Sequence, residues 1–159
     1  MHTSFWGMHF TARYTPDEVI TKIGTKGEYL GTESPDDSSV KNILYKNIVF
    51  RDFSWDYGSV SVVGTLLCEI KFQEEFSSHK AARDYLYSLK SKLGRRYLMK
   101  PKARRTDSEE SFIFKDSEQS DWEGATAIIS LTSDKPYSYY VSLYYYTLDI
   151  NRFTSNTLF

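Results

Sequence analysis

The residues that most often carry catalysis or bind metals are few in this chain and far apart. Histidine occurs only at His2, His9 and His79, and Cys68 is the single cysteine. Because no His-x-x-x-His or Cys-x-x-Cys spacing is present, the sequence predicts no metal site. Cys68 lies in an apolar run and is expected to be a small buried side chain. His79, in the first turn of a predicted helix, is expected to face solvent.

Motifs that cradle phosphates or present a nucleophilic serine are also absent. The chain contains no Gly-x-x-x-x-Gly-Lys-Ser/Thr, no Gly-x-Gly-x-x-Gly and no Gly-x-Ser-x-Gly. The acidic pairs Asp36-Asp37, Glu74-Glu75 and Glu109-Glu110 are adjacent in sequence. Neighbours on a strand point to opposite faces, so such a pair is not by itself a catalytic dyad. The sequence predicts no catalytic residue and no cofactor, and an enzyme with a pocket between helices and sheet is a third alternative.

A tyrosine-rich segment near the C-terminus carries the main candidate binding residues. If alternate residues of this strand face the helices, the opposite face presents Tyr140, Tyr144 and Tyr146. Tyrosine is favoured at interfaces because it is large, rigid and amphipathic. The pattern predicts contact with an unknown protein partner, or self-association, through these three residues. Coverage of the same face by a loop or by the C-terminal tail is the alternative.

A basic segment lies between Lys90 and Arg105, where eight Lys and Arg residues occur without an acidic one. The net charge of the whole chain is −1, so the rest of the chain is acidic. Such asymmetry predicts a polyanion site, for nucleic acid or an anionic surface, or a segment that folds back over acidic loops. Nucleic acid is disfavoured because Tyr97 alone is close enough in sequence for base stacking. The candidate electrostatic residues are Arg95, Arg96, Lys100, Lys102, Arg104 and Arg105.

The elements that position these residues follow from composition and periodicity. With 159 residues, 40% hydrophobic and 16% aromatic, the chain is expected to form one β-rich globular domain. Thr15, Pro16 and Glu18 match a capping box and predict a helix over residues 16–24. A second helix is predicted over 78–93, where apolar residues recur every three or four positions before Gly94.

The remaining pattern predicts six strands and an α+β fold. Polar loops are expected at 31–42 and 100–110, and a turn at 56–58. We expect a two-layer sandwich, helix-strand-strand-strand repeated twice, with an antiparallel sheet and both helices on one face. The single domain 1–159 would divide into halves 1–72 and 73–150, followed by a flexible tail 151–159. The predicted strands are 43–53, 59–63, 66–72, 111–115, 125–132 and 137–148.

Several short passages resemble an uncharacterised family of small secreted or periplasmic bacterial envelope domains. The opening Phe5-Trp6-Gly7-Met8-His9-Phe10 matches the family's Phe-x-Gly-x-x-Phe turn. Leu93-Gly94-Arg95-Arg96-Tyr97 resembles its Leu-Gly-x-x-Tyr passage after the second helix. The predicted layout is also similar to beta-lactamase-inhibitor-protein-like modules and to small outer-membrane assembly lipoproteins. The resemblance implies a periplasmic or secreted location and carries no reaction with it. The tyrosine strand and the charge asymmetry are the reasons to expect a non-enzymatic binding module.

Membrane and export signals are missing from the given chain. No apolar run approaches the roughly 20 residues of a spanning helix, so no transmembrane segment is predicted. The first residues, from Met1 to Trp6, have neither a basic region nor an apolar core, so no signal peptide is present as given.

Overall fold

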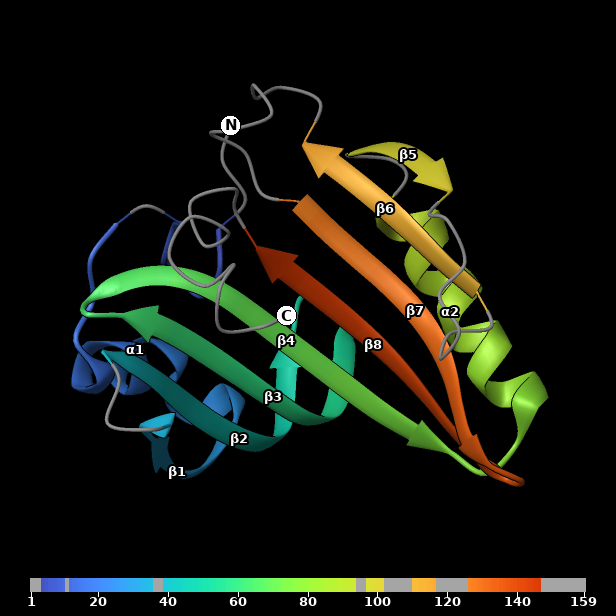
Figure 1. Ribbon diagram of the computed structural model, residues 1–159, viewed down its shortest axis with the longest axis horizontal. Helices are drawn as coiled ribbons and strands as arrows, with labels where there is room; N and C mark the ends of the chain where they lie inside the picture. Colours follow the sequence, from blue (N-terminus) through green and yellow to red (C-terminus); the bar gives the residue numbers. More distant parts are fainter. Residues whose placement is uncertain are drawn as a thin grey trace.

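The described residues form a fold of the mixed α+β class, with an antiparallel sheet and two α-helices (Figure 1). The computed structural model describes residues 4–10, 12–35, 39–93, 97–101, 110–116 and 126–146, and only the backbone of 97–101, 114–116 and 126. The predicted tail 151–159 lies outside these residues. Buried side chains from both halves of the chain form one hydrophobic cluster.

The two helices begin where their capping residues predict. Helix α1 spans Pro16–Ile23, and Thr15 and Glu18 each accept the other's backbone N–H at 3.2 Å, which confirms the capping box. A short 3-10 turn, η1 (Gly24–Lys26), follows it. Helix α2 spans His79–Leu93, and the Ser78 hydroxyl accepts the Ala81 N–H at 3.3 Å. Its buried stripe, which packs on the sheet, consists of Ala82, Leu86, Leu89 and Leu93.

Within the described residues, eight strands form the sheet, in the order β1-β2-β3-β4-β8-β7-β6-β5, and every neighbouring pair is antiparallel. Each half of the chain forms a four-stranded meander, and the two meanders join where β4 pairs with β8 (Figure 1). The strands are β1 (Glu28–Glu33), β2 (Val40–Phe50), β3 (Phe53–Val63), β4 (Leu66–Phe76), β5 (Tyr97–Pro101), β6 (Glu110–Asp116), β7 (Thr126–Lys135) and β8 (Ser138–Tyr146).

In the part of the chain that the structure describes, four strands follow each helix, so the prediction of three was wrong. The two missed strands, β1 and β5, are the edges of the sheet. Strand β1 is mostly exposed and contains a bulge next to Gly31, so it lacks the apolar alternation that reveals a strand. Strand β5 ends at Pro101, a residue that predicts a linker but is tolerated at a sheet edge. Strand β4 also runs past residue 72, where the boundary between the halves was expected.

The predicted turn at 56–58 is instead the middle of β3. The chain reverses earlier, through the two residues Arg51 and Asp52, and Phe50 pairs with Phe53. Glycine is required at position 58 because a larger side chain would not fit, and not because the chain turns there. A Cβ on Gly58 would lie 2.8 Å from Cγ2 of Ile48 and 3.4 Å from the ring of Phe72.

The β2–β3 hairpin bends so that its tip stays in the core. Tyr45 and Ile48 are both buried although they are three residues apart, an odd step that would place them on opposite faces of a regular strand. Trp55 is likewise buried three residues before Gly58. Asn47 adopts a left-handed φ of 49° at this point. Figure 1 shows the hairpin turning across behind β4.

An aromatic stack holds the bent hairpin against the sheet. The Phe72 ring of β4 stacks on Phe50 at 5.1 Å and on Trp55 at 5.4 Å between ring centroids. Phe50 also stacks on Phe5 at 5.5 Å. Phe5 belongs to the predicted opening turn, in which Phe5 and Met8 exchange both backbone hydrogen bonds at 2.8 Å. The fifteen-residue helix α2 and this opening segment therefore share one core with both meanders.

We expect Gly58→Ala to destabilise the protein by about 1–3 kcal/mol, because the added methyl group overlaps Ile48 in a closely packed core. Urea denaturation followed by circular dichroism measures the change. The neighbouring Ser59→Ala is the matched control, since Ser59 lies on the other face, and should stay within about 0.5 kcal/mol of the wild type. Equal effects of the two substitutions would contradict this account of Gly58.

Candidate functional site

The candidate tyrosines Tyr140, Tyr144 and Tyr146 share one face of β8. They alternate with Val141, Leu143 and Tyr145, which belong to the hydrophobic core. Since successive side chains of a strand point to opposite sides, the three tyrosines lie on the face of the sheet turned away from this core. We call this the reverse face. All three tyrosines are partly exposed.

Hydrogen bonds and stacking fix the tyrosines in place. The Tyr144 hydroxyl donates to Oε2 of Glu69 on β4 at 2.8 Å, and its ring stacks on Tyr146 with centroids 5.1 Å apart. Burial, together with the Glu69 charge, raises the pKa of Tyr144 above its usual range. The Tyr140 hydroxyl accepts from Ser138 at 3.4 Å. These contacts make the tyrosines a preorganised surface, which loses little side-chain entropy on binding.

Charges of both signs border the tyrosines on β4. Tyr146, Tyr144 and Tyr140 are paired in register with Glu69, Lys71 and Glu75. On the other side, β7 contributes Thr132 opposite Tyr140 and the apolar Ile128 opposite Tyr144. The reverse face at β8 is therefore amphipathic, with neither a purely basic nor a purely acidic border.

A hollow of about 270 Å³ lies on the reverse face beside these residues. Leu30 of β1 and Tyr57 of β3 line it and are more than half exposed, at 52% and 53%. Leu44 adds to the apolar side of the hollow, and Lys71 provides its charged side. Lys71 is also the register partner of Tyr144, so the hollow and the tyrosines are neighbours on one surface.

Sequence reasoning missed Leu30 and Tyr57 as surface residues of this face. Residue 57 was assigned to a turn, and the structure places Tyr57 opposite Gln73 within the β3–β4 ladder. A signal was available, because Tyr57 and Ser59 alternate with Gly58 and Val60 as in a strand with one wet face. Leu30 carries no such signal, since it sits at the bulge of an edge strand.

Most of the predicted electrostatic residues lie outside the described chain. Arg95, Arg96, Lys102, Arg104 and Arg105 are not described, and Lys100 is described only by its backbone in β5. The prediction that they form a polyanion site therefore stays a prediction.

The two basic residues at the start of the segment have partners within the protein. Lys90 lies 4.4 Å from the centroid of the Phe112 ring, and Lys92 Nζ lies 2.7 Å from Oδ2 of Asp52. Both side chains therefore stabilise the packing of α2 on its neighbours.

The isolated chemical residues are placed as the sequence predicts. Cys68 is buried, its thiol donates to the Ser61 carbonyl at 3.2 Å, and burial raises its pKa to about 12, so it is a poor nucleophile. His79 is exposed and its ring contacts Tyr139 at 5.3 Å. In the described part of the chain no three His, Cys, Asp or Glu side chains gather as metal ligands. Neither helix there is long and apolar enough to cross a membrane.

The structure brings together an acidic pair that the sequence did not predict. Where β3 leaves the β4 ladder at the hairpin bend, the Asp56 N–H donates to Oε2 of Glu74 at 2.8 Å. In return, the Glu75 N–H donates to Oδ2 of Asp56 at 2.9 Å. Two carboxylates thus replace the backbone acceptors that the bend removes, which gives the pair a structural role.

Ionised Glu74 is destabilised by this arrangement. Its partial burial, and then the charge of Asp56, raise its pKa above the usual range. Helix α2 closes over the same region, because the Tyr85 hydroxyl donates to the Ser54 carbonyl at 2.8 Å. Burial and the two nearby carboxylates also raise the pKa of Tyr85.

Comparisons with known proteins yield no relative: no family model, no curated protein and no solved structure matches this chain.

We expect Glu74→Gln to raise the free energy of unfolding at pH 7 and to flatten its pH dependence. Because the folded state raises the pKa of Glu74, it binds the proton more tightly than the unfolded chain, so wild-type stability falls as pH rises above about 4.5. Glutamine keeps an oxygen acceptor for the Asp56 N–H and removes the repulsion. Urea denaturation from pH 4 to pH 7 measures both effects.

The matched control is Glu75→Gln, which alters an exposed neighbour whose backbone alone takes part in the pair. This control should keep the wild-type slope. A Glu74→Gln protein that is less stable than wild type at pH 7, with an unchanged slope, would contradict the assignment.

Proposed function

We propose that this protein is a non-enzymatic binding module whose reverse face docks a protein partner. The proposal takes the fold to be a two-layer sandwich, in which both helices cover one side of the sheet and the other side is left for the partner. The observation that carries the proposal is the continuous, partly exposed surface formed by Tyr140, Tyr144, Tyr146 and the adjacent hollow.

The composition of this surface favours a protein over other partners. Leu30 and Tyr57 are large apolar side chains that are more than half exposed and line a hollow. Interfaces typically combine such anchors with tyrosines and a polar rim. A hydrophobic side chain of a partner would fill the hollow, and the tyrosines beside it would supply flat contact area and hydroxyl groups.

The charge pattern argues against a polyanion at the same surface. Glu69 and Glu75 flank Lys71 along β4, and Glu69 already accepts from Tyr144. A nucleic acid or an anionic membrane needs a cluster of unpaired basic residues. The mixed border suits a protein, whose own surface carries both signs.

We place the module in the bacterial cell envelope, as a periplasmic or secreted protein. The support is the resemblance of the opening turn at residues 5–10 to envelope domains. The genomic start of the native chain tests it, because an upstream signal peptide would direct export and a start at Met1 without one would remove this support.

Site-specific photocrosslinking tests the docking proposal. A benzophenone amino acid in place of Tyr57 should form a covalent adduct with one defined partner in the source cells. The same amino acid in place of Tyr137, which is 81% exposed at the tip of the β7–β8 hairpin, should not. The adduct is identified by mass spectrometry, and its partner is then purified for binding measurements.

Substitutions on the reverse face should weaken binding of the purified partner at least about tenfold. The triple variant Tyr140→Ser, Tyr144→Ser, Tyr146→Ser removes the tyrosine contacts, and Lys71→Glu reverses one exposed charge with little effect on folding. Lys135→Glu is the matched control on an exposed position at the hairpin end. A homodimer in sedimentation experiments would identify a second copy as the occupant.

Two results would overturn the proposal. One is that Lys71→Glu and a folded triple variant both bind the purified partner with wild-type affinity. The other is an adduct at Tyr137 alone. Salt-sensitive retention on heparin, unaffected by the face variants, would favour the polyanion alternative through residues 90–105.

A further inference from the structure

A second pocket lies on the helix side of the sheet, where the tip of the β2–β3 hairpin meets α2 and β8. Its volume is about 210 Å³. A cavity of about 150 Å³ accommodates a benzene ring, while drug-sized ligands occupy roughly 300–1,000 Å³. The pocket therefore fits a ligand with a single ring and a small substituent.

The inner wall of the pocket is apolar and rich in rings. It is lined by the hairpin aromatics and by side chains of α2 and β8: Phe50, Phe53, Leu89, Leu93, Leu143 and Tyr145. Aromatic rings favour edge-to-face and offset contacts with another ring. The wall thus suits an aromatic body better than a polar one.

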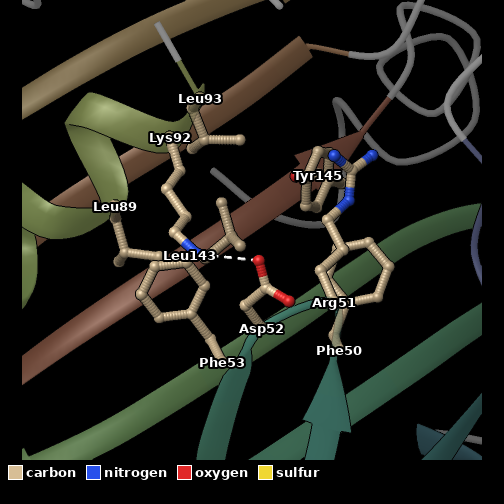
Figure 2. A pocket seen from close by; sticks show the side chains of 9 residues that line it. All are labelled: Phe50, Arg51, Asp52, Phe53, Leu89, Lys92, Leu93, Leu143 and Tyr145. Carbon is tan, nitrogen blue, oxygen red and sulfur yellow. Dashed lines mark hydrogen bonds and ion pairs between the residues drawn. The ribbon is translucent and has the colours of Figure 1, made fainter. Parts of the chain in front are cut away.

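Three charged groups line the pocket besides these residues. Figure 2 shows Lys92 extending from α2 to Asp52, with Nζ and Oδ2 2.7 Å apart, and Arg51 extending beside Tyr145. The hydrogen bond and the charge of Lys92 lower the pKa of Asp52, so this carboxylate stays ionised. Two cations and one anion leave a net positive charge.

Arg51 supplies the charge that is not neutralised. Its side chain is exposed, and its guanidinium lies 5.2 Å from the centroid of the Phe50 ring. Among the described residues, no carboxylate forms an ion pair with it. A guanidinium can bind a carboxylate through two parallel hydrogen bonds.

The backbone at Arg51 is unusual for this residue type. Its φ is +57°, a left-handed conformation at the first position of a two-residue hairpin turn. That position is normally Gly, Asn or Asp, because a Cβ is unfavourable there. The turn therefore holds a long cationic side chain at the pocket where a glycine would fold more easily, and strained residues of this kind cluster at ligand sites.

We propose that this pocket binds a small aromatic carboxylate, with its ring against the Phe50, Phe53 and Leu143 wall and its carboxylate on Arg51. Lys92 adds a second positive charge next to the ligand while it remains paired with Asp52. The site is on the opposite side of the sheet from the tyrosines and is independent of the docking function.

A titration with phenylacetate, followed by ¹H–¹⁵N NMR spectra of the full chain, tests the proposal. We expect saturable shifts at the backbone amides of residues 50–53 and 89–93. The uncharged 2-phenylethanol should bind about tenfold more weakly, because it cannot pair with the guanidinium. No saturable shifts with phenylacetate, or shifts of equal affinity with both compounds, would overturn the proposal.

Two substitutions at the pocket should change affinity in opposite directions. Arg51→Asn keeps a residue that tolerates the left-handed turn and should weaken phenylacetate binding about tenfold without affecting 2-phenylethanol. Asp52→Asn frees Lys92 from its intramolecular partner and should strengthen phenylacetate binding. Unchanged affinity in a folded Arg51→Asn protein would overturn the role of the guanidinium.

Two further variants separate a binding role of Arg51 from a structural one. Arg51→Gly relieves the backbone strain, so it should raise the melting temperature while it weakens phenylacetate binding. Lys80→Met is the matched control for general electrostatics, because Lys80 lies at the other end of α2 and pairs with Asp84. An equal loss of binding in Lys80→Met and Arg51→Asn would overturn a local site.

Discussion

The packing of the β2–β3 hairpin across Phe72 determines how the rest of the protein is built. A flat continuation of β2 and β3 would carry Phe50 and Trp55 out into water. Instead, Asn47 bends one strand, and both rings stack on Phe72 at centroid distances of 5.1 and 5.4 Å. Burial of an aromatic side chain removes about 150–250 Å² from solvent, worth several kcal/mol for two rings, so it outweighs the few ladder hydrogen bonds lost at the bend.

The bend exposes backbone groups that the protein satisfies with acidic side chains. Asp56 and Glu74 take over from the β3–β4 ladder at the point where the strands separate, and Tyr85 and Lys92 of α2 then hold the hairpin tip. Asp56, Glu74 and Lys92 are thus occupied in maintaining the hairpin geometry.

How far the sequence predicts this structure depends on the range of the interactions involved. The helices were located correctly because their signals are local: Thr15 and Glu18 cap α1, and leucines three or four residues apart mark α2. The placement of Tyr140, Tyr144 and Tyr146 opposite the core follows from the two-residue period of a strand. The turn predicted at Gly58 was wrong. A glycine is needed there because Ile48, on the adjacent strand, leaves no room for a Cβ, and a local sequence pattern does not contain such a contact across strands. The Arg51 pocket needs three distant segments to meet, so no spacing in the sequence reveals it.

The reverse face and the Arg51 pocket differ in how far their side chains are ordered before a ligand binds. On the reverse face, the Tyr144–Glu69 bond and the Tyr144–Tyr146 stack order the side chains in advance, so binding there would consume little conformational entropy and would suit a broad, rigid protein surface. At the hairpin tip, the Phe50, Phe53 and Leu143 wall is also rigid, but Arg51 is an exposed side chain on a strained turn. An exposed cation next to an apolar wall would discriminate between ligands by charge and by size together. The proposed recognition surface for macromolecules and the proposed pocket for small anions would therefore lie on opposite sides of one sheet.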